Sequence, residues 1–161
     1  MSKEFRSGAI GALIDEYERA VSHLKIILKS IPDDELIRIA DFSTNDENCR
    51  SIQTILTHVL NSGYGYAISI HNLKGPEKQR PPKKIHTTIG QYIEDLDQLV
   101  TFTEQVLSSF NDKELEQTDH SRKIKTGWEQ LYDIEQLMEH AIVHILRHRR
   151  QIEKMQSVKL K

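Results

Sequence analysis

The sequence predicts an all-α protein, a four-helix bundle with long crossover connections, on three observations. Four long segments carry apolar residues at three- and four-residue intervals, which is the spacing of an amphipathic helix. Aromatic residues make up only 6% of the chain, which holds just seven Gly and four Pro. No segment alternates convincingly as a strand would. Since 161 residues can enclose one core, we expect a single domain over residues 1–161.

The first two helices are bounded by residues that start or stop a helix. The first is predicted over about residues 7–30, because apolar positions recur there and Pro32 cannot continue a helix. A polar segment with the composition of a loop follows. Ser51 then suits the N-cap of the second helix, which should end near Leu73, just ahead of a Gly-Pro pair.

The third helix follows a proline-rich basic linker, residues 75–84, which we expect to be an exposed crossover. Thr88 and Gln91 have the spacing of a capping box, in which each side chain accepts a hydrogen bond from the other residue's backbone N–H. The helix that they open should end near Asn111.

The polar connection over residues 111–128 is unusually long for a compact bundle. Residues 121–126 within it alternate as a short extended segment would. Long ordered connections often carry function, so this one could cover a pocket. The fourth helix is predicted to begin between residues 129 and 133 and to run to about Gln156.

Composition excludes several classes of partner. The 22 basic and 24 acidic residues give a net charge of -2, which offers no field for nucleic acid or an anionic membrane. Cys49 is the lone cysteine, so neither an intrachain disulfide nor a multi-cysteine zinc site can form. No stretch approaches the roughly 18 apolar residues of a membrane span, and the amino terminus lacks the apolar run of a signal peptide. We therefore expect a soluble, cytoplasmic protein.

Three histidines at four-residue spacing, His140, His144 and His148, are the strongest functional signal. Residues four apart on a helix are neighbours, so an adjacent pair could hold one metal ion. The outer two lie about 12 Å apart along the axis and cannot share it. The apolar stripe of the helix is centred on Ile134, Met138, Ala141, Ile145 and Ile152. His148 projects about 40° from that centre, His144 about 80°, and His140 further toward solvent.

A third ligand should come from another helix, as in metal sites built inside bundles. His58 is the best candidate, because it lies in the apolar middle of the second helix, although the helical wheel puts it on the flank of the apolar stripe. His23 in the first helix is the alternative ligand. His71, His86 and His120 have the positions of surface or boundary residues.

The segment from Ser51 to His58, followed much later by His144-Ile145-Leu146-Arg147-His148-Arg149-Arg150-Gln151, resembles the DinB/YfiT-like superfamily over nearly the whole chain. The resemblance implies a DinB/YfiT-like four-helix bundle, often dimeric, with His58, His144 and His148 as ligands of a divalent metal ion. The family pattern usually has Arg-Gly-Gln after the last histidine. This chain has Arg149-Arg150-Gln151, which leaves the ligands in place.

The resemblance also implies a function. Some members of the superfamily transfer low-molecular-weight thiols such as bacillithiol or mycothiol to electrophiles, and a related group isomerises maleylpyruvate. We therefore expect a metal-dependent thiol transferase in stress response or detoxification, with zinc or nickel as the ion, a small-molecule thiol and an electrophile as partners, and a homodimer as the assembly. A non-catalytic, metal-stabilised interaction or dimerisation domain and a metal-dependent hydrolase are the alternatives. No residue stands out as a general acid or base, and Trp128 could form a wall of the substrate site.

Overall fold

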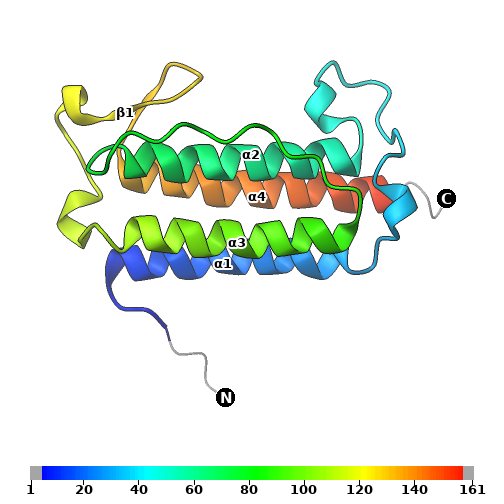
Figure 1. Ribbon diagram of the computed structural model, residues 1–161, viewed down its shortest axis with the longest axis horizontal. Coiled ribbons are helices and arrows are strands. Elements are labelled where there is room, and N and C mark those ends of the chain that lie inside the picture. Colours follow the sequence, from blue (N-terminus) through cyan, green and yellow to red (C-terminus); the bar gives the residue numbers. More distant parts are fainter. Residues whose placement is uncertain (1–4, 158–161) are drawn as a thin grey trace.

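The computed structural model describes residues 5–157, and within them four α-helices form the predicted bundle (Figure 1). The helices are α1 (Gly8–Leu28), α2 (Ile52–His71), α3 (Ile89–Leu107) and α4 (Ile134–Ser157). The all-α fold class is thereby confirmed. Among residues 5–157, none of the helices combines the length and the apolar character that crossing a membrane requires.

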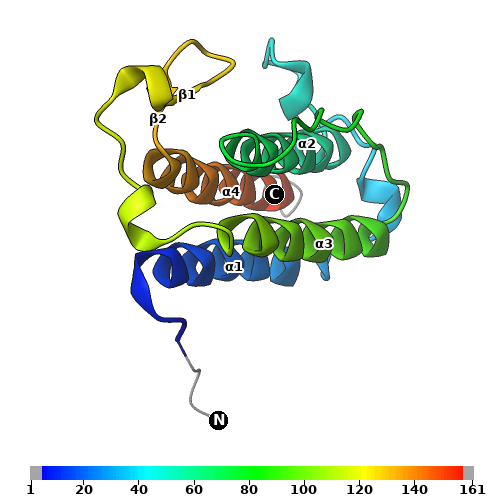
Figure 2. The ribbon, with the colours of Figure 1, turned by 60° about the vertical axis from the view of Figure 1, so that its left-hand side comes forward.

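Each helix packs on two neighbours. α1 and α2 both contact α3 and α4, so α1 lies diagonally across the bundle from α2. α2 and α3 run in the same direction, and α1 and α4 run the opposite way (Figures 1 and 2). The linker from α2 to α3 therefore returns along the length of the bundle, as a crossover connection. The pair that matters most for the site is α2 and α4, which are antiparallel neighbours.

Side-chain caps set the helix starts. The Ser51 hydroxyl accepts from the N–H of Thr54, whose own hydroxyl accepts from the N–H of Ser51, so the predicted N-cap of α2 is a full capping box. Thr88 and Gln91 form the second predicted box at the start of α3. Two helix boundaries differ from the prediction: α3 ends at Leu107 instead of near residue 111, and α4 begins at Ile134, one residue after the predicted range of 129–133.

Local polar side chains explain both differences. Asn111 caps a separate 3₁₀ turn, Asp112–Glu114, so the chain leaves the α-helix before it. Asp133 and Gln136 exchange side-chain to backbone hydrogen bonds of 2.9 and 3.0 Å, which fixes the start of α4. Asp and Asn compete with helical hydrogen bonds through such contacts, and apolar periodicity does not register them.

The connection from α3 to α4 carries the one β-ladder of the described residues. Strands β1 (Ile124–Lys125) and β2 (Leu131–Tyr132) pair antiparallel, at the end of the bundle where α4 begins (Figure 2). The extended segment expected within residues 121–126 is confirmed at β1. The turn between the strands places Glu129 at φ 66°, and Trp128 stands at its tip.

The core joins Leu and Ile side chains of all four helices. Among those with no exposed surface are Leu24, Leu28, Ile55, Leu56, Leu96, Leu99 and Ile152. Truncating such a residue to Ala costs about 2–5 kcal/mol. α2 has buried residues on most of its turns, because the linker covers the face that the other helices leave free (Figure 1).

His86, just after this linker, is buried, so the expectation of a surface or boundary residue was wrong. It is 7% exposed, and its Nε2 lies 2.7 Å from Oδ2 of Asp95 on α3. Its carbonyl accepts a 2.9 Å hydrogen bond from Nε2 of Gln53 on α2. Tyr64 donates to the other Asp95 oxygen at 2.8 Å. The sequence did not predict this burial, because His86 lies in a polar stretch and its partners come from two distant helices.

Candidate metal centre

The structure brings His58, His144 and His148 together between α2 and α4. The Nε2 atoms of His58 and His144 are 3.0 Å apart, and those of His144 and His148 are 3.2 Å apart. One nitrogen from each ring lies within 4.8 Å of the other two. Because the ring nitrogens converge on one point, the cluster could hold a metal ion.

Helical geometry explains the convergence. His144 and His148 are one turn apart on α4 and are 5% and 3% exposed, respectively. His58 lies on the flank of α2, as the helical wheel indicated, and α4 packs against that flank. A residue at the edge of one helix's apolar stripe thus becomes the facing partner of two buried residues on its neighbour.

His140 and His23 lie outside the cluster. The His140 ring stacks on Trp128, with centroids 4.6 Å apart and planes 23° apart, and its centroid is 6.1 Å from that of His144. His23 is exposed on α1. The structure therefore groups the three histidines that the family resemblance singled out, while their assignment as ligands stays a prediction.

Burial keeps the cluster rings neutral. Desolvation is the main cause that lowers the pKa of His144 to about 2 and that of His148 to about 4, with smaller effects from the neighbouring histidines and from Arg147. Burial also lowers the pKa of His58. Since a metal binds the unprotonated imidazole nitrogen, these rings are ready to act as ligands at neutral pH.

The ring positions fit a small divalent ion. Zinc binds imidazole nitrogen at about 2.0–2.1 Å, which places two nitrogens of a tetrahedral site about 3.3 Å from each other. The two separations from Nε2 of His144, 3.0 and 3.2 Å, are close to that spacing. Three imidazoles also leave the fourth tetrahedral position free, as in catalytic zinc sites.

A chain of half-buried to exposed polar contacts leads away from His148. Nδ1 of His148 lies 2.6 Å from the amide oxygen of Gln151, one turn further along α4. The amide nitrogen of Gln151 contacts Sγ of Cys49 at 3.6 Å, just ahead of α2. The Cys49 thiol in turn lies 3.5 Å from a carboxylate oxygen of Asp46.

The exposed rim is mainly basic. Arg80, Lys83 and Arg147 each lower the pKa of His58 through their charge, whereas Asp46 raises it. Arg80 reaches this rim across Gly65 of α2, where the Cβ of any other residue would collide with its guanidinium. The basic rim favours an anionic group at the open side of the centre.

Aromatic rings form the wall beyond His144. The Tyr66 ring stands nearly perpendicular to those of His144 and His140, at centroid distances of 5.8 and 5.4 Å. Trp128, which is 43% exposed, closes this wall from the turn between β1 and β2. Trp128 as a wall of a substrate site stays a prediction.

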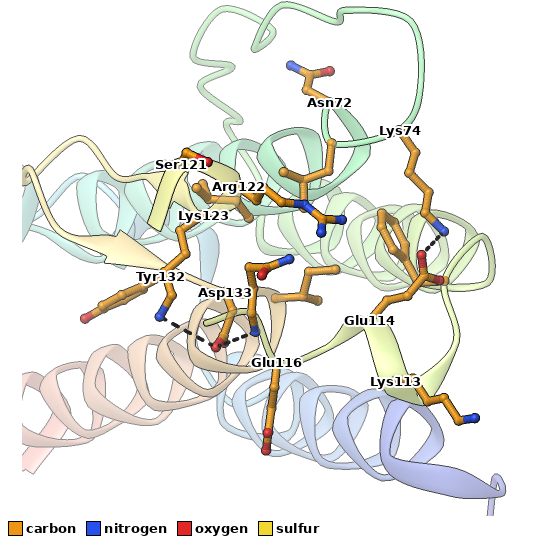
Figure 3. A pocket seen from close by; sticks show the side chains of 15 residues that line it. Asn72, Lys74, Lys113, Glu114, Glu116, Ser121, Arg122, Lys123, Tyr132 and Asp133 are labelled. Carbon is orange, nitrogen blue, oxygen red and sulfur yellow. Dashed lines mark hydrogen bonds and ion pairs between the residues drawn. The ribbon is translucent and has the colours of Figure 1, made fainter. Parts of the chain in front are cut away.

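The connection from α3 to α4 also lines a cavity of about 580 Å³, shown in Figure 3. Its walls include the end of α2 at Asn72 and the start of α4 at Ile134, so it lies toward the other end of the bundle from the histidines. Two of its three carboxylates have cationic partners: Glu114 pairs with Lys74, and Asp133 pairs with Lys123. The connection does cover a pocket, as expected, but that pocket is separate from the candidate metal centre.

Sequence reasoning missed several neighbours of the centre. Cys49, Asp46, Tyr66 and Arg80 reach it through tertiary packing, and no local pattern points to them. Gln151 could have been found, because it lies three residues after His148 on the same helix face.

The comparisons with known proteins agree with the fold. No curated protein matches the chain. The model of the DinB family matches residues 1–156, almost the full length of the sequence. The chain therefore belongs to the DinB family.

Proposed function

We propose that this protein is a metal-dependent transferase that joins a low-molecular-weight thiol to an electrophile. The observation that carries the proposal is the convergence of three neutral imidazoles on one point, with Nε2 separations of 3.0 and 3.2 Å. Membership of the DinB family supports it, because some members of the wider superfamily transfer such thiols. Zinc and nickel are the ions that we expect.

Different residues of the chain would have different roles in the reaction. His58, His144 and His148 would hold the ion, which when bound supplies a site where a thiol loses its proton at neutral pH. Arg80 and Arg147 would attract the anionic form of the thiol to the rim. Tyr66 and Trp128 would shield the electrophile from water.

The overall reaction balances as a substitution. The thiol proton leaves to solvent, a bond forms between sulfur and the electrophilic carbon, and the leaving group departs with its bonding electron pair. The chain therefore needs to align two small molecules and keep the sulfur deprotonated. It needs no redox partner.

A conjugation assay tests the proposal. Metal-free protein purified without a histidine tag is loaded with zinc or nickel and given monochlorobimane with bacillithiol, mycothiol or cysteine, and the fluorescent thioether is followed. We expect saturable turnover that His144→Ala lowers by more than about 100-fold, since removing a ligand should cost more than removing a supporting residue. His23→Ala, an exposed change on α1, serves as the matched control.

Two outcomes would go against a transferase. If the metal-loaded protein accelerates conjugation of none of these thiols, the transferase proposal fails. If chelation lowers the melting temperature while no thiol is turned over, a metal-stabilised interaction domain takes its place.

A further inference from the structure

We propose that Gln151 is a positioning residue of the metal centre, which holds the proton of His148 on Nδ1 and leaves Nε2 free for the ion. The inference rests on the proposed function wherever it invokes the binding of metal. The tautomer of His148 is a property of the metal-free protein and can be measured there.

The contact is short and well placed. Oε1 of Gln151 lies 2.6 Å from Nδ1 of His148, which is well inside hydrogen-bond range. The two residues are three apart on α4 and therefore lie on the same face. An amide oxygen can only accept a hydrogen bond, so Nδ1 must carry the proton.

The opposite amide orientation does not suit the cluster. If the amide nitrogen of Gln151 faced His148, Nδ1 would be the acceptor and the proton would sit on Nε2. That Nε2 lies 3.2 Å from Nε2 of His144, at the point where the three rings converge. A protonated nitrogen there cannot be a metal ligand, so only the amide oxygen on Nδ1 presents all three nitrogens.

A second contact, in which the amide nitrogen is nearer than the amide oxygen to Sγ of Cys49, supports this orientation. Nε2 of Gln151 lies 3.6 Å from Sγ of Cys49, which can accept a weak hydrogen bond. Cys49 belongs to the 3₁₀ turn Glu47–Cys49 that precedes α2, the helix of His58. Gln151 thus ties the ring of His148 to the segment that leads into the other half of the centre. Second contacts of this kind orient a ligand ring and commonly change metal affinity by about 10–100-fold.

The first test is the tautomer of His148 in the metal-free protein at neutral pH, read from the ¹⁵N chemical shifts of its two ring nitrogens. The wild-type chain should show a protonated Nδ1 and an unprotonated Nε2. Gln151→Leu removes the acceptor at similar size, so the ring should shift toward the Nε2-protonated form. Gln151→Glu keeps an acceptor oxygen and should restore the wild-type pattern.

The second test is metal affinity, measured by zinc competition with a chelator of known affinity. We expect Gln151→Leu to weaken binding by about 10–100-fold and Gln151→Glu to recover most of it. Gln156→Leu is the matched control, because its amide nitrogen has no hydrogen-bond partner among residues 5–157. Melting temperatures of the metal-free variants report whether each still folds.

The outcomes separate the two proposals. A wild-type His148 protonated on Nε2, or one whose tautomer Gln151→Leu leaves unchanged, would overturn the role of Gln151. An unchanged zinc affinity in folded Gln151→Leu would do the same. If the wild-type protein binds no divalent metal, the proposed function fails, and the tautomer measurement still decides whether Gln151 orients the ring.

Discussion

At the scale of single residues, the candidate centre is a set of buried bases that folding keeps neutral. His144 and His148 are 5% and 3% exposed, and burial holds their pKa values at about 2 and about 4. In the unfolded chain, the pKa of a histidine is about 6.5. The unfolded state therefore binds protons more readily than the folded state at every pH between these values.

The sign of the resulting pH dependence follows from linkage. These pKa values are lowered on folding, so the metal-free protein should have its full stability above about pH 6.5 and lose it as the pH falls. Each of the two rings contributes up to about 1.4 kcal/mol per pH unit in this range. Urea unfolding in the presence of a chelator, at neutral pH and at about pH 5, measures the loss.

Two variants test whether the cluster histidines cause this pH dependence of stability. A double substitution, His144→Leu with His148→Leu, should flatten the slope, whereas His23→Leu on the exposed face of α1 should leave it as in the wild type. A metal-free wild-type protein that is equally stable at both pH values would contradict the burial of neutral rings.

Some residues of the candidate centre can be identified from the sequence and others cannot, for a physical reason. His144 and His148 stand out because their spacing puts both toward the apolar stripe of one helix. His58 needed the family resemblance, because its position on the flank of α2 is typical of a boundary residue. Arg80 and Cys49 approach the centre from connections whose path depends on the whole bundle.

At the scale of elements, the linker between α2 and α3 determines what surrounds the centre. It carries Arg80 to the rim, and His86 fixes its far end through the 2.7 Å contact with Asp95. A hydrogen-bonded anchor at one end lets a proline-rich segment keep a defined path along α2. The linker thus runs along α2 as an exposed crossover, as the sequence predicts (Figure 1).

Removing the anchor should destabilise the protein. His86→Ala leaves a buried carboxylate oxygen of Asp95 without its imidazole partner, at a cost of about 1–3 kcal/mol. The midpoint of urea unfolding at neutral pH measures this loss, with exposed His120→Ala as the control. Equal midpoints for His86→Ala and the wild type would show that the contact contributes nothing to stability.

Helix starts were better predicted than helix ends. Both capping boxes have the required residues at fixed spacing, so Ser51 and Thr88 mark the starts of α2 and α3 correctly. α3 stops short of the predicted end because Asn111 caps a separate turn. Apolar residues continue past Leu107, and periodicity alone cannot distinguish such a turn from one more turn of helix.

At the scale of the whole molecule, topology creates the centre. α2 and α4 are far apart in the sequence, and they become antiparallel neighbours because the linker returns along the bundle (Figure 1). A helical wheel describes one helix at a time, so it cannot say which helices face each other. The fold class followed from the sequence, whereas the pairing of α2 with α4 needed the structure.

The homodimer stays a prediction at this scale. Val143 and Leu146 are 60% and 37% exposed on the outer side of α4, so this helix offers apolar surface to a second copy. Light scattering of the purified protein would decide the assembly, and a monomer at working concentration would rule the dimer out.

The metal content of protein purified without a histidine tag tests the candidate centre most directly. Elemental analysis of the wild type should find close to one divalent ion per chain. His58→Ala, His144→Ala and His148→Ala should each lose the ion, and His140→Ala should keep it, since the His140 ring lies outside the cluster. A wild-type protein without a near-stoichiometric divalent metal, or three ligand variants that all retain it, would contradict the assignment.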